Sequence, residues 1–474
     1  MATGKKKERT PSAIYEFRLL TNKIHDRELL KLMDIGRMHY NAVLGEALRR
    51  LKAIKQDPLY AETVAIPKDS SENIALRAKN FKLLNEKHGF RKYDLESFGT
   101  QCKNNSKFLD RLGTHVLQKL SGRAFEAVQK VALGKAKKVR FKRKGEYVSL
   151  EGKNNETYLR YSNTYALIDK YTIKCKLRKN DKYFEHFLKH RIKFCRVITR
   201  RIGSKDKFFL QVVFEGKPYE KVKLGELHTT LDIGPSTIAT VNSQEATLEK
   251  FCSEIVDQSK HIKTLQRQAS RKLRLANPQN YDDKGAVKKG AKKWVRSNNY
   301  LKLKDKIADI QRRLAARRKQ LHCIKVNSIV SQSYKVSAEK ISYKAFQKMY
   351  GKSIGACAPA SFEKRLKDKI TLLGGKYQEI NTYKTKLSQT CICGKIHKKQ
   401  LSERTHNCLE CGTIMQRDLF SAYLALFVSS TNKLNLKQAK KNYPNYEPIL
   451  NQCLEQLKVL KETEPHKIPT SFGI

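Results

Sequence analysis

The chain has 474 residues, a length that suits about two to four domains with their own cores. Lysine and arginine number 98 against 45 aspartate and glutamate residues, so the formal net charge is +53. Such an excess repels itself unless a polyanion neutralises it, and nucleic acid is the natural polyanion. A membrane surface is the competing partner, but no apolar run approaches the roughly 20 residues of a spanning helix. The composition therefore favours nucleic acid over a membrane as the partner, and we expect no membrane-spanning helix.

The cysteines and the first residues bear on cellular location. Eleven cysteines are an odd number. Seven of them are scattered singly, which does not fit a disulfide framework. The opening segment MATGKKKERTPSAIYEF lacks the apolar core of a secretory signal. We therefore expect a reducing, cytoplasmic location.

Residues 1–225 are predicted to form a small antiparallel β-domain with a helical insertion at about residues 25–130. AIYEFRLL alternates apolar and polar residues as a strand does, and KFFLQVVFEG is typical of a buried strand. Between them, apolar side chains recur at helical spacing, namely Leu29, Leu32, Met33, Tyr40 and Leu44. Pro58 to Ser106 shows few clean periods, and we assign no regular structure there.

The next region, residues 226–387, alternates strands and helices. LHTTLDIGPSTIATV predicts a strand, a tight Gly-Pro turn and a second strand. A long basic helical tract follows at about residues 259–325, with expected breaks near 277–280 and 285–290. Its later half places four apolar residues on one face, namely Leu303, Ile307, Ile310 and Leu314.

The rest of the chain holds shorter elements. YKVSAEKI predicts a strand that ends near Glu339, SFEKRLKDKITLL a helix, and GKYQEI a further strand. A segment with four cysteines occupies residues 388–414, and a helix at 415–428 closes the domain. The tail, residues 429–474, has little apolar periodicity, and we expect it to be poorly ordered.

Basic residues gather in two places, Lys135 to Lys144 and Lys260 to Lys325. Charge runs are usually solvated helix faces, but here the excess extends over nearly the whole chain, which favours nucleic-acid binding. Three aromatic residues nearby, Phe141, Tyr147 and Trp294, are candidates for stacking on bases and equally typical of a core. The candidate contacts are Lys137, Lys138, Arg140, Lys142, Arg143, Arg267, Arg271, Lys272, Arg312 and Arg313.

Three acids stand at the ends of predicted elements. Asp232 lies in a strand between Leu231 and Ile233, where a charge is costly without a partner or a cation. Glu339 ends another strand, and Asp418 opens a helix. Three carboxylates brought together by a mixed sheet suit two-metal phosphodiester hydrolysis with Mg²⁺. Each also has an ordinary alternative: a turn residue for Asp232, a strand-end acid for Glu339 and an N-cap for Asp418.

The cysteine segment is more specific. Cys391/Cys393 and Cys408/Cys411 form two tight pairs, and each pair is followed by a glycine. Four such thiols suit a tetrahedral zinc ion, and a closed four-ligand site is structural. The first pair, Cys-Ile-Cys, is one residue shorter than the usual spacing, so His397 or His406 could replace a cysteine as ligand.

These motifs resemble a known family. LDIGPSTIATV, SAEKI and QRDLFSAYLAL resemble the three RuvC-type nuclease motifs of transposon-encoded TnpB proteins and type V CRISPR effectors, and their order matches. LQRQASRKLR and SNNYLKLKDKIADIQRRLAARRKQLH are similar to the basic helices of that family. SQTCICG and RTHNCLECG are similar to its zinc-ribbon halves, and YEFRLL…GRMHYNAVL to its start. The resemblance covers most of the chain and is strong from residue 226 to 427.

The resemblance implies a multidomain α+β fold. Residues 1–225 would form a β-barrel-like wedge domain with a helical recognition insertion. An RNase H-like (RuvC) α/β nuclease domain would follow, with a zinc ribbon inserted at residues 388–414. Asp232, Glu339 and Asp418 would be catalytic Mg²⁺ ligands. A structural Zn²⁺ would be held by Cys391, Cys393, Cys408 and Cys411.

The implied activity is RNA-guided cleavage of double-stranded DNA in a prokaryotic cytosol or nucleoid. Base pairing with a guide RNA would choose the target, and the protein would read a short flanking motif. The oligomeric state, monomer or dimer, stays open. Two alternatives also remain: an RNase H-like transposase or resolvase without guide RNA, and a guide-dependent DNA-binding protein without cleavage. The presence of all three acids argues against the second.

Overall fold

The computed structural model describes residues 10–255, 257–290, 292–400, 403–464, 468–469 and 472–473. It divides into two compact units, Met1–Tyr219 and Glu220–Ile474, and each has its own sheet and buried cores. Both units combine helices and strands, which confirms the expected multidomain architecture of mixed secondary structure. Residues 1–9, on which part of the predicted location depends, lie outside the described residues.

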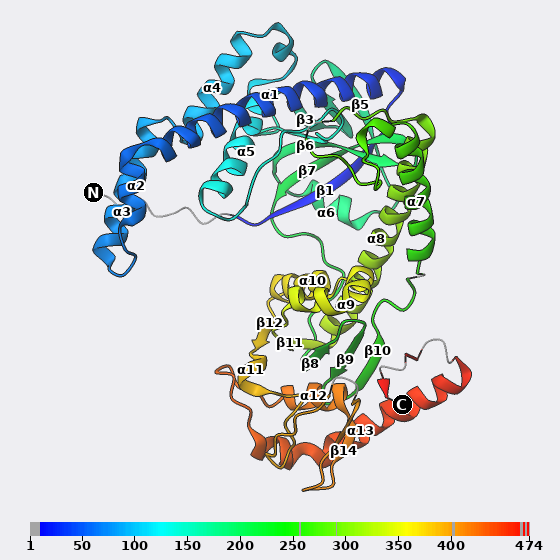
Figure 1. Ribbon diagram of the computed structural model, residues 1–474. Coiled ribbons are helices and arrows are strands. Elements are labelled where there is room, and N and C mark those ends of the chain that lie inside the picture. Colours follow the sequence, from blue (N-terminus) through cyan, green and yellow to red (C-terminus); the bar gives the residue numbers. More distant parts are fainter. Residues whose placement is uncertain are drawn as a thin grey trace. The chain divides into compact units, whose positions relative to one another are not determined.

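The first unit is built on a seven-stranded antiparallel sheet (Figure 1). The strand order is β2-β6-β7-β1-β5-β4-β3, so the first strand of the chain lies between two much later ones. β3 and β6 also contact each other, so the sheet curls. The expected strands at AIYEFRLL and KFFLQVVFEG are confirmed as β1 and β7. The bounds are β1 Ser12–Leu19, β2 Ser149–Glu151, β3 Leu159–Ser162, β4 Tyr165–Ile168, β5 Tyr171–Lys176, β6 Ile192–Ile202 and β7 Lys205–Glu215.

The chain between β1 and β2 is mostly helical. The five residues predicted at helical spacing are all buried on α1. Three helices lie between Pro58 and Ser106, where no regular structure was assigned from the sequence. Asp57 and Ser70 cap the first two of them, and these two helices bury too few apolar side chains to show a clear helical pattern. The bounds are α1 Lys23–Gln56, α2 Pro58–Ala65, α3 Ser71–Lys87, α4 Lys92–Asn104, η1 Lys107–Arg111 and α5 Thr114–Ala132; α6, Lys182–Leu188, follows β5.

The second unit has a five-stranded mixed sheet in the order β10-β9-β8-β11-β12. β8, β9 and β10 are antiparallel neighbours, whereas β11 and β12 run parallel to β8. The expected strand-turn-strand unit is confirmed as β8 and β9. The bounds are β8 Leu227–Ile233, β9 Thr237–Val241, β10 Ala246–Lys250, β11 Ser333–Glu339 and β12 Lys376–Ile380.

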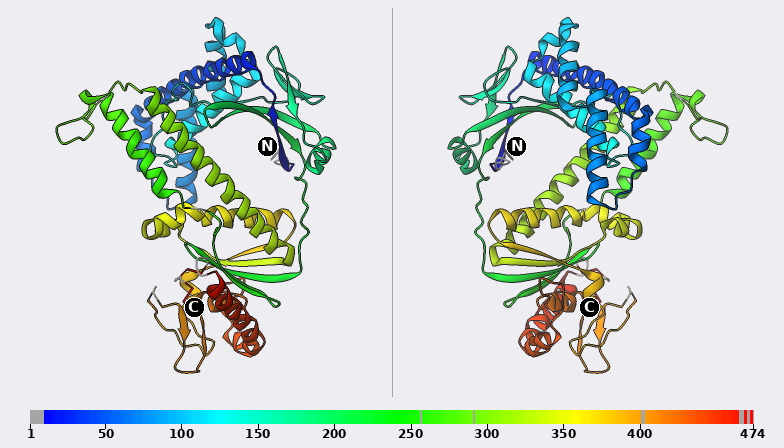
Figure 2. Two further views of the ribbon diagram at one scale, coloured as in Figure 1. Left: turned by 90° about the vertical axis from the view of Figure 1, so that its right-hand side faces the viewer. Right: turned by 90° about the vertical axis from the view of Figure 1, so that its left-hand side faces the viewer.

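Helices cover both faces of this sheet (Figures 1 and 2). One face packs on α9 (Tyr343–Cys357), α10 (Pro359–Leu372) and the end of α8 (Asn298–Gln332). The other packs on α12 (Arg417–Ala425) and α13 (Leu436–Thr463). Leu231 and Ile233 belong to the first core. Since side chains alternate along a strand, their neighbour Asp232 faces α12.

The basic helical tract is confirmed as α7 (Ser259–Leu275) and α8, which contact each other. The expected break near residue 277 is a loop that contains η2, Pro278–Asn280. The four apolar residues of the predicted face belong to one cluster with Leu265 of α7, so the hydrophobic seam joins the two helices.

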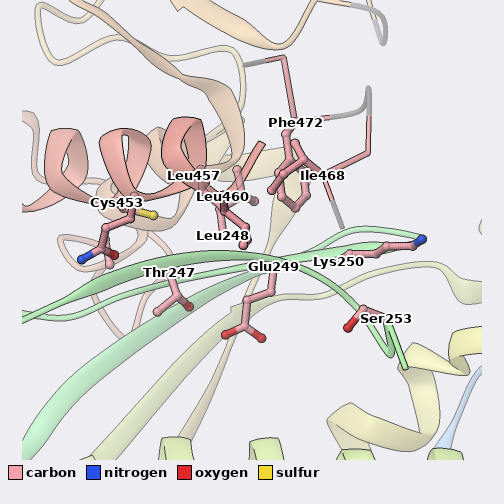
Figure 3. A pocket seen from close by; sticks show the side chains of 12 residues that line it. Thr247, Leu248, Glu249, Lys250, Ser253, Cys453, Leu457, Leu460, Ile468 and Phe472 are labelled. Carbon is pink, nitrogen blue, oxygen red and sulfur yellow. The ribbon is translucent and has the colours of Figure 1, made fainter. Parts of the chain in front are cut away.

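The C-terminal tail differs from expectation. It contains the 28-residue helix α13, whose buried side chains recur at helical spacing around Pro444 and Pro448. The two prolines obscured this pattern. α13 and the edge strand β10 border an open pocket of about 350 Å³. Figure 3 shows its apolar side chains, which include Leu248, Leu457, Leu460, Ile468 and Phe472, and the polar side chains of Thr247 and Glu249 on β10.

Two further findings concern the whole described chain. None of its helices combines the length and apolar character needed to cross a membrane. All 11 cysteines lie within the described residues, and each is a free thiol.

Candidate functional site

Two of the three acids lie side by side because β8 and β11 are parallel. Ala338 of β11 is the register partner of Leu231 of β8. The next residues, Glu339 and Asp232, therefore lie side by side on the face that packs on α12; Glu339 is the last residue of β11 and Asp232 the second-last of β8. Asp232 is itself paired with Ala239 within the sheet, so its alternative role as a turn residue is wrong.

The third acid comes from the first turn of α12. Asp418 is buried there, but Gln416 is the N-cap, and its side-chain oxygen accepts a hydrogen bond from Leu419 N at 2.8 Å. The alternative role of Asp418 as the helix cap is therefore wrong. Thr230 of β8 donates a 2.6 Å hydrogen bond to the carbonyl of Ala422, which fixes α12 on the sheet.

The three acids are close enough to affect one another's ionisation. Burial raises the pKa of Asp232 well above its usual value, and the negative charges of Asp418 and Glu339 raise it further. Burial also raises the pKa of Glu339 to about 7. Oε1 of Glu339 is buried and has no hydrogen-bond partner among the described residues. The chain thus holds carboxylates where their ionisation is costly without a cation.

Two arginines that the sequence reasoning missed border this site. Nε and Nη2 of Arg417 each lie 3.3 Å from Oδ1 of Asp418, and Nη1 of Arg404 lies 4.0 Å from its Oδ2. Their positive charges partly offset the rise in the pKa of Asp232. The sequence could have pointed to Arg417, because it directly precedes Asp418. Arg404 lies in the cysteine segment, and no local pattern relates it to the acids.

The acid site fits a divalent metal ion. Carboxylate oxygens are the donors that Mg²⁺ prefers, and the unpartnered oxygen of Glu339 has a lone pair to offer. The acids do not form one tight cage: within the described residues, only the cysteine group gathers three or more potential ligand atoms within 4.8 Å of one another. Three carboxylates from different elements are the kind of donor set that two-metal sites use.

The four cysteines converge as predicted. Their sulfur atoms all lie within 4.8 Å of one another, with 3.4 Å between Cys391 and Cys411 and 3.6 Å between Cys393 and Cys408. Four thiolates about 2.3 Å from a zinc ion would stand about 3.8 Å apart. Burial alone would raise the pKa of the Cys411 thiol, but hydrogen bonds from Thr413 and neighbouring thiols lower it to about 6. The cluster fits a zinc ion.

The shortened first pair does not prevent this convergence. Each pair closes a tight turn on a glycine with positive φ: Gly394 N donates to Cys391 O, and Gly412 N donates to Cys408 O. Only glycine adopts such a conformation without strain. Both pairs therefore present their thiols to the same point despite the difference in spacing.

The two alternative histidine ligands occupy different places. The ring of His406 stacks on Phe420 at 4.2 Å, and Lys399 Nζ contacts its Nδ1. His397 instead lies beside the cysteines, with Nε2 3.6 Å from Cys408 Sγ. His406 belongs to β13 (Thr405–Asn407), which pairs with β14 (Ile414–Gln416). The stack joins the cysteine segment, residues 388–414, which we call the cysteine module, to Phe420 of α12, two residues after Asp418.

Nine of the ten predicted basic contacts fall into two groups, and the tenth, Lys272, is half-buried on α7. Those between Lys137 and Arg143 are exposed in the loop after α5, and Arg267 and Arg271 are exposed on α7. Arg312 and Arg313 instead form ion pairs with Asp309 at 2.7 and 3.1 Å, so their charge is partly compensated.

The aromatic candidates also separate. Phe141 is 54% exposed. Tyr147 packs against the cores of the first unit. Trp294 contacts Tyr281 edge-on, with ring centroids 5.9 Å apart. Phe141 is therefore the candidate with the most accessible ring.

Residues 360–424 match the protein family described as Cas12f1-like, TNB domain. This segment holds all but the first residue of α10, together with β12, the four cysteines and Asp418. The match confirms the resemblance to the TnpB and type V effector family in this part of the chain. No curated protein matches the chain.

Three solved structures are similar to the chain at 12% sequence identity. One is the Cas12f1–sgRNA–target DNA complex (TM-score 0.38; 87% of this chain and 98% of that chain covered). Another is the CRISPR-Cas12f ternary complex (TM-score 0.27; 86% and 82%). The third is CasPhi-2 (Cas12j) bound to crRNA and phosphorothioate-DNA (TM-score 0.31; 90% and 92%).

Proposed function

We propose that this chain, whose residues 360–424 match the Cas12f1-like TNB domain, is an RNA-guided DNA endonuclease. The observation that carries the proposal is the convergence of Asp232, Glu339 and Asp418, which are far apart in sequence, on one face of the sheet. The raised pKa of Asp232, which burial and the charges of Asp418 and Glu339 cause, supports a cation at this site.

An RNase H-like (RuvC) identity for the second unit is supported by its topology. Three antiparallel strands are followed by two that run parallel to the first, and the acids come from the first strand, the fourth strand and a helix packed beside them. This arrangement agrees with the order of the three motifs that resemble the family. The basic helices α7 and α8 lie between the first two acids.

The three ionised carboxylates would hold Mg²⁺. Bound metal ions would activate water and stabilise the leaving oxygen of the phosphodiester. A cation beside Asp232 and Glu339 would favour their charged forms, which the buried site otherwise disfavours. Arg417 contacts the Asp418 carboxylate at 3.3 Å, and Arg404 lies 4.0 Å from it. The cysteine module would bind a structural Zn²⁺ and fix Arg404 and His406 against α12.

The proposed partners are a guide RNA and a double-stranded target DNA. A net charge of +53 suits a chain that carries a large polyanion. Base pairing would supply the target specificity, and the protein would hold the heteroduplex through its backbone. The exposed cations after α5 and along α7 are the candidate backbone contacts.

Sequencing the RNA that co-purifies with the protein, from cells that carry its native locus, tests the proposal. We expect discrete RNA species with a constant region and a guide segment. DNA that matches the guide should be cut with Mg²⁺ and remain bound but intact with EDTA. A random mixture of RNA fragments would contradict guidance, and binding without cleavage in Mg²⁺ would contradict the nuclease.

A further inference from the structure

The loop at residues 133–148, between α5 and β2, is the most concentrated basic segment of the first unit. We call it the basic loop. Its single acid is Glu146, and all of its lysine and arginine side chains are exposed. These cations are Lys135, Lys137, Lys138, Arg140, Lys142, Arg143 and Lys144.

The basic loop is fixed on helix α1 without the use of its charges. The amide of Asn41 donates a hydrogen bond to the carbonyl of Lys142 at 2.8 Å, and Lys142 N donates back to Asn41 Oδ1 at 2.9 Å. Nη1 of Arg37 lies 3.4 Å from the same carbonyl. Both Asn41 bonds use the backbone of Lys142, so they leave its ammonium available. The centre of the loop is therefore positioned and still charged.

Phe141 presents its ring beside this anchor. The ring edge faces Gly45 of α1: a Cβ built on this glycine would lie 3.7 Å from Cε1 of Phe141, which is an ordinary van der Waals distance. More than half of the side chain, 54%, remains exposed. Its neighbours Val139 and Tyr147 pack into a core cluster instead. Val139 and Tyr147 are thus partly buried, whereas the ring of Phe141 stays accessible between cations.

The residues around Phe141 line a hollow of about 580 Å³, namely Arg140, Phe141, Lys142, Arg143 and Glu146. This volume falls in the range of ligand pockets. An exposed ring flanked by cations is the arrangement that binds single-stranded nucleic acid, because bases stack on the ring while cations contact the phosphates. A duplex keeps its base faces stacked internally, so it would meet only the charges.

We propose that the basic loop binds an unpaired nucleotide of the guide RNA, a role that rests on the proposed function. Phe141 stacks on the base, and Arg140, Lys142 and Arg143 contact the adjacent phosphates. Asn41 is a positioning residue, because it holds the loop without touching the nucleotide.

Fluorescence titration of the full chain with a labelled single-stranded RNA, and with the same strand annealed to its complement, tests this site across a range of salt. Phe141→Leu keeps an apolar side chain on Gly45 and removes the ring. We expect it to weaken binding of the single strand by about fivefold or more and to leave duplex binding unchanged. Asn41→Ala should weaken binding of the single strand without a change in net charge. The variant that combines Asn41→Ala with Phe141→Leu should lose less binding free energy than the sum of the two single losses, because both changes act on the same contact.

Changing Arg140, Lys142 and Arg143 together to Gln should reduce the slope of log affinity against log salt by about 2 for the single strand. The matched control changes three exposed lysines elsewhere in the unit, Lys68, Lys79 and Lys82, to Gln. An equal slope change in the control would overturn the proposal, because general charge would then explain binding. So would equal losses for single strand and duplex in Phe141→Leu.

Guide-dependent cleavage is measured in parallel for every variant. If the wild-type chain neither retains a guide nor cuts, the proposed function fails. If the wild-type chain does both and Phe141→Leu binds single-stranded RNA as tightly, only the basic-loop assignment fails. Thermal unfolding of Phe141→Leu and Asn41→Ala should stay close to wild type, since neither side chain belongs to a buried core.

Discussion

Replacing Glu339 by Gln should make the metal-free protein more stable at pH 8 while abolishing its response to divalent metal. The folded protein raises the pKa of Glu339 from 4.5 to about 7, and burial is the cause. Each pKa unit corresponds to about 1.4 kcal/mol, so ionising this side chain in the folded state costs about 3 kcal/mol. Gln keeps the shape of the side chain and removes the charge.

The sign of the pH dependence follows from the raised pKa. In the wild-type protein the stability associated with protonated Glu339 is complete below about pH 4.5 and is lost as the pH rises through about 7. The advantage of Glu339→Gln should therefore be large at pH 8 and mostly absent at pH 5. Neutralising Glu339 also removes one of the negative charges that raise the pKa of Asp232, which acts in the same direction.

Hydrogen exchange of peptides from β8 and β11 is the appropriate assay, because a chain of two units need not unfold in a single step. Mn²⁺ should increase protection of these peptides in the wild-type protein and not in Glu339→Gln. The control is Glu379→Gln on the adjacent strand β12. Lys367 lies 2.6 Å from Glu379 and lowers its pKa, so this variant should gain nothing at pH 8. A gain for Glu339→Gln that is equal at pH 5 and pH 8 would refute the reasoning.

Three further predictions concern the second unit. Gly225→Ala should destabilise the unit by about 2 kcal/mol or more in thermal unfolding, because a Cβ there would lie 2.0 Å from the backbone carbonyl carbon of Gln332. The control is Gly351→Ala on helix α9, where a Cβ would have no neighbour within 4 Å, and this variant should be neutral or stabilising. Thr230→Val should cost about 1–3 kcal/mol in unfolding experiments and slow DNA cleavage, since it leaves the buried carbonyl of Ala422 without its donor; an unchanged stability would contradict this contact. Metal analysis should find one zinc per chain in His397→Ala and none in Cys408→Ser, whereas zinc loss in His397→Ala would contradict the four-cysteine site.

Much of the second unit could be predicted because its sequence patterns are local. The alternation in LHTTLDIGPSTIATV and the apolar seam of α8 specify their elements almost alone. The α13 helix could not be found this way, because Pro444 and Pro448 interrupt the pattern and its burial depends on β10 and α12. Tertiary packing stabilises this helix, and a short sequence window contains no record of that contact.

The candidate site shows the same division. The three acids were identifiable as charged residues at element ends, but their proximity depends on the parallel register of β8 with β11, which no local pattern encodes. Arg404 illustrates the limit most clearly, since it approaches Asp418 only through the fold of the cysteine module. The sequence also could not decide whether His397 or His406 lies beside the cysteines, because His406 is held away from them by its stack on Phe420, a residue of a separate element.

Cleavage of a plasmid programmed by the guide tests the central claim most directly. The wild-type protein, loaded with a guide of chosen sequence and Mg²⁺, should cut DNA at the matching site, and a new guide should move the cut. Asp232→Ala should bind the same RNA and DNA with similar affinity and leave the plasmid intact. Cutting by Asp232→Ala at the wild-type rate, or a cut position that ignores the guide, would contradict the account.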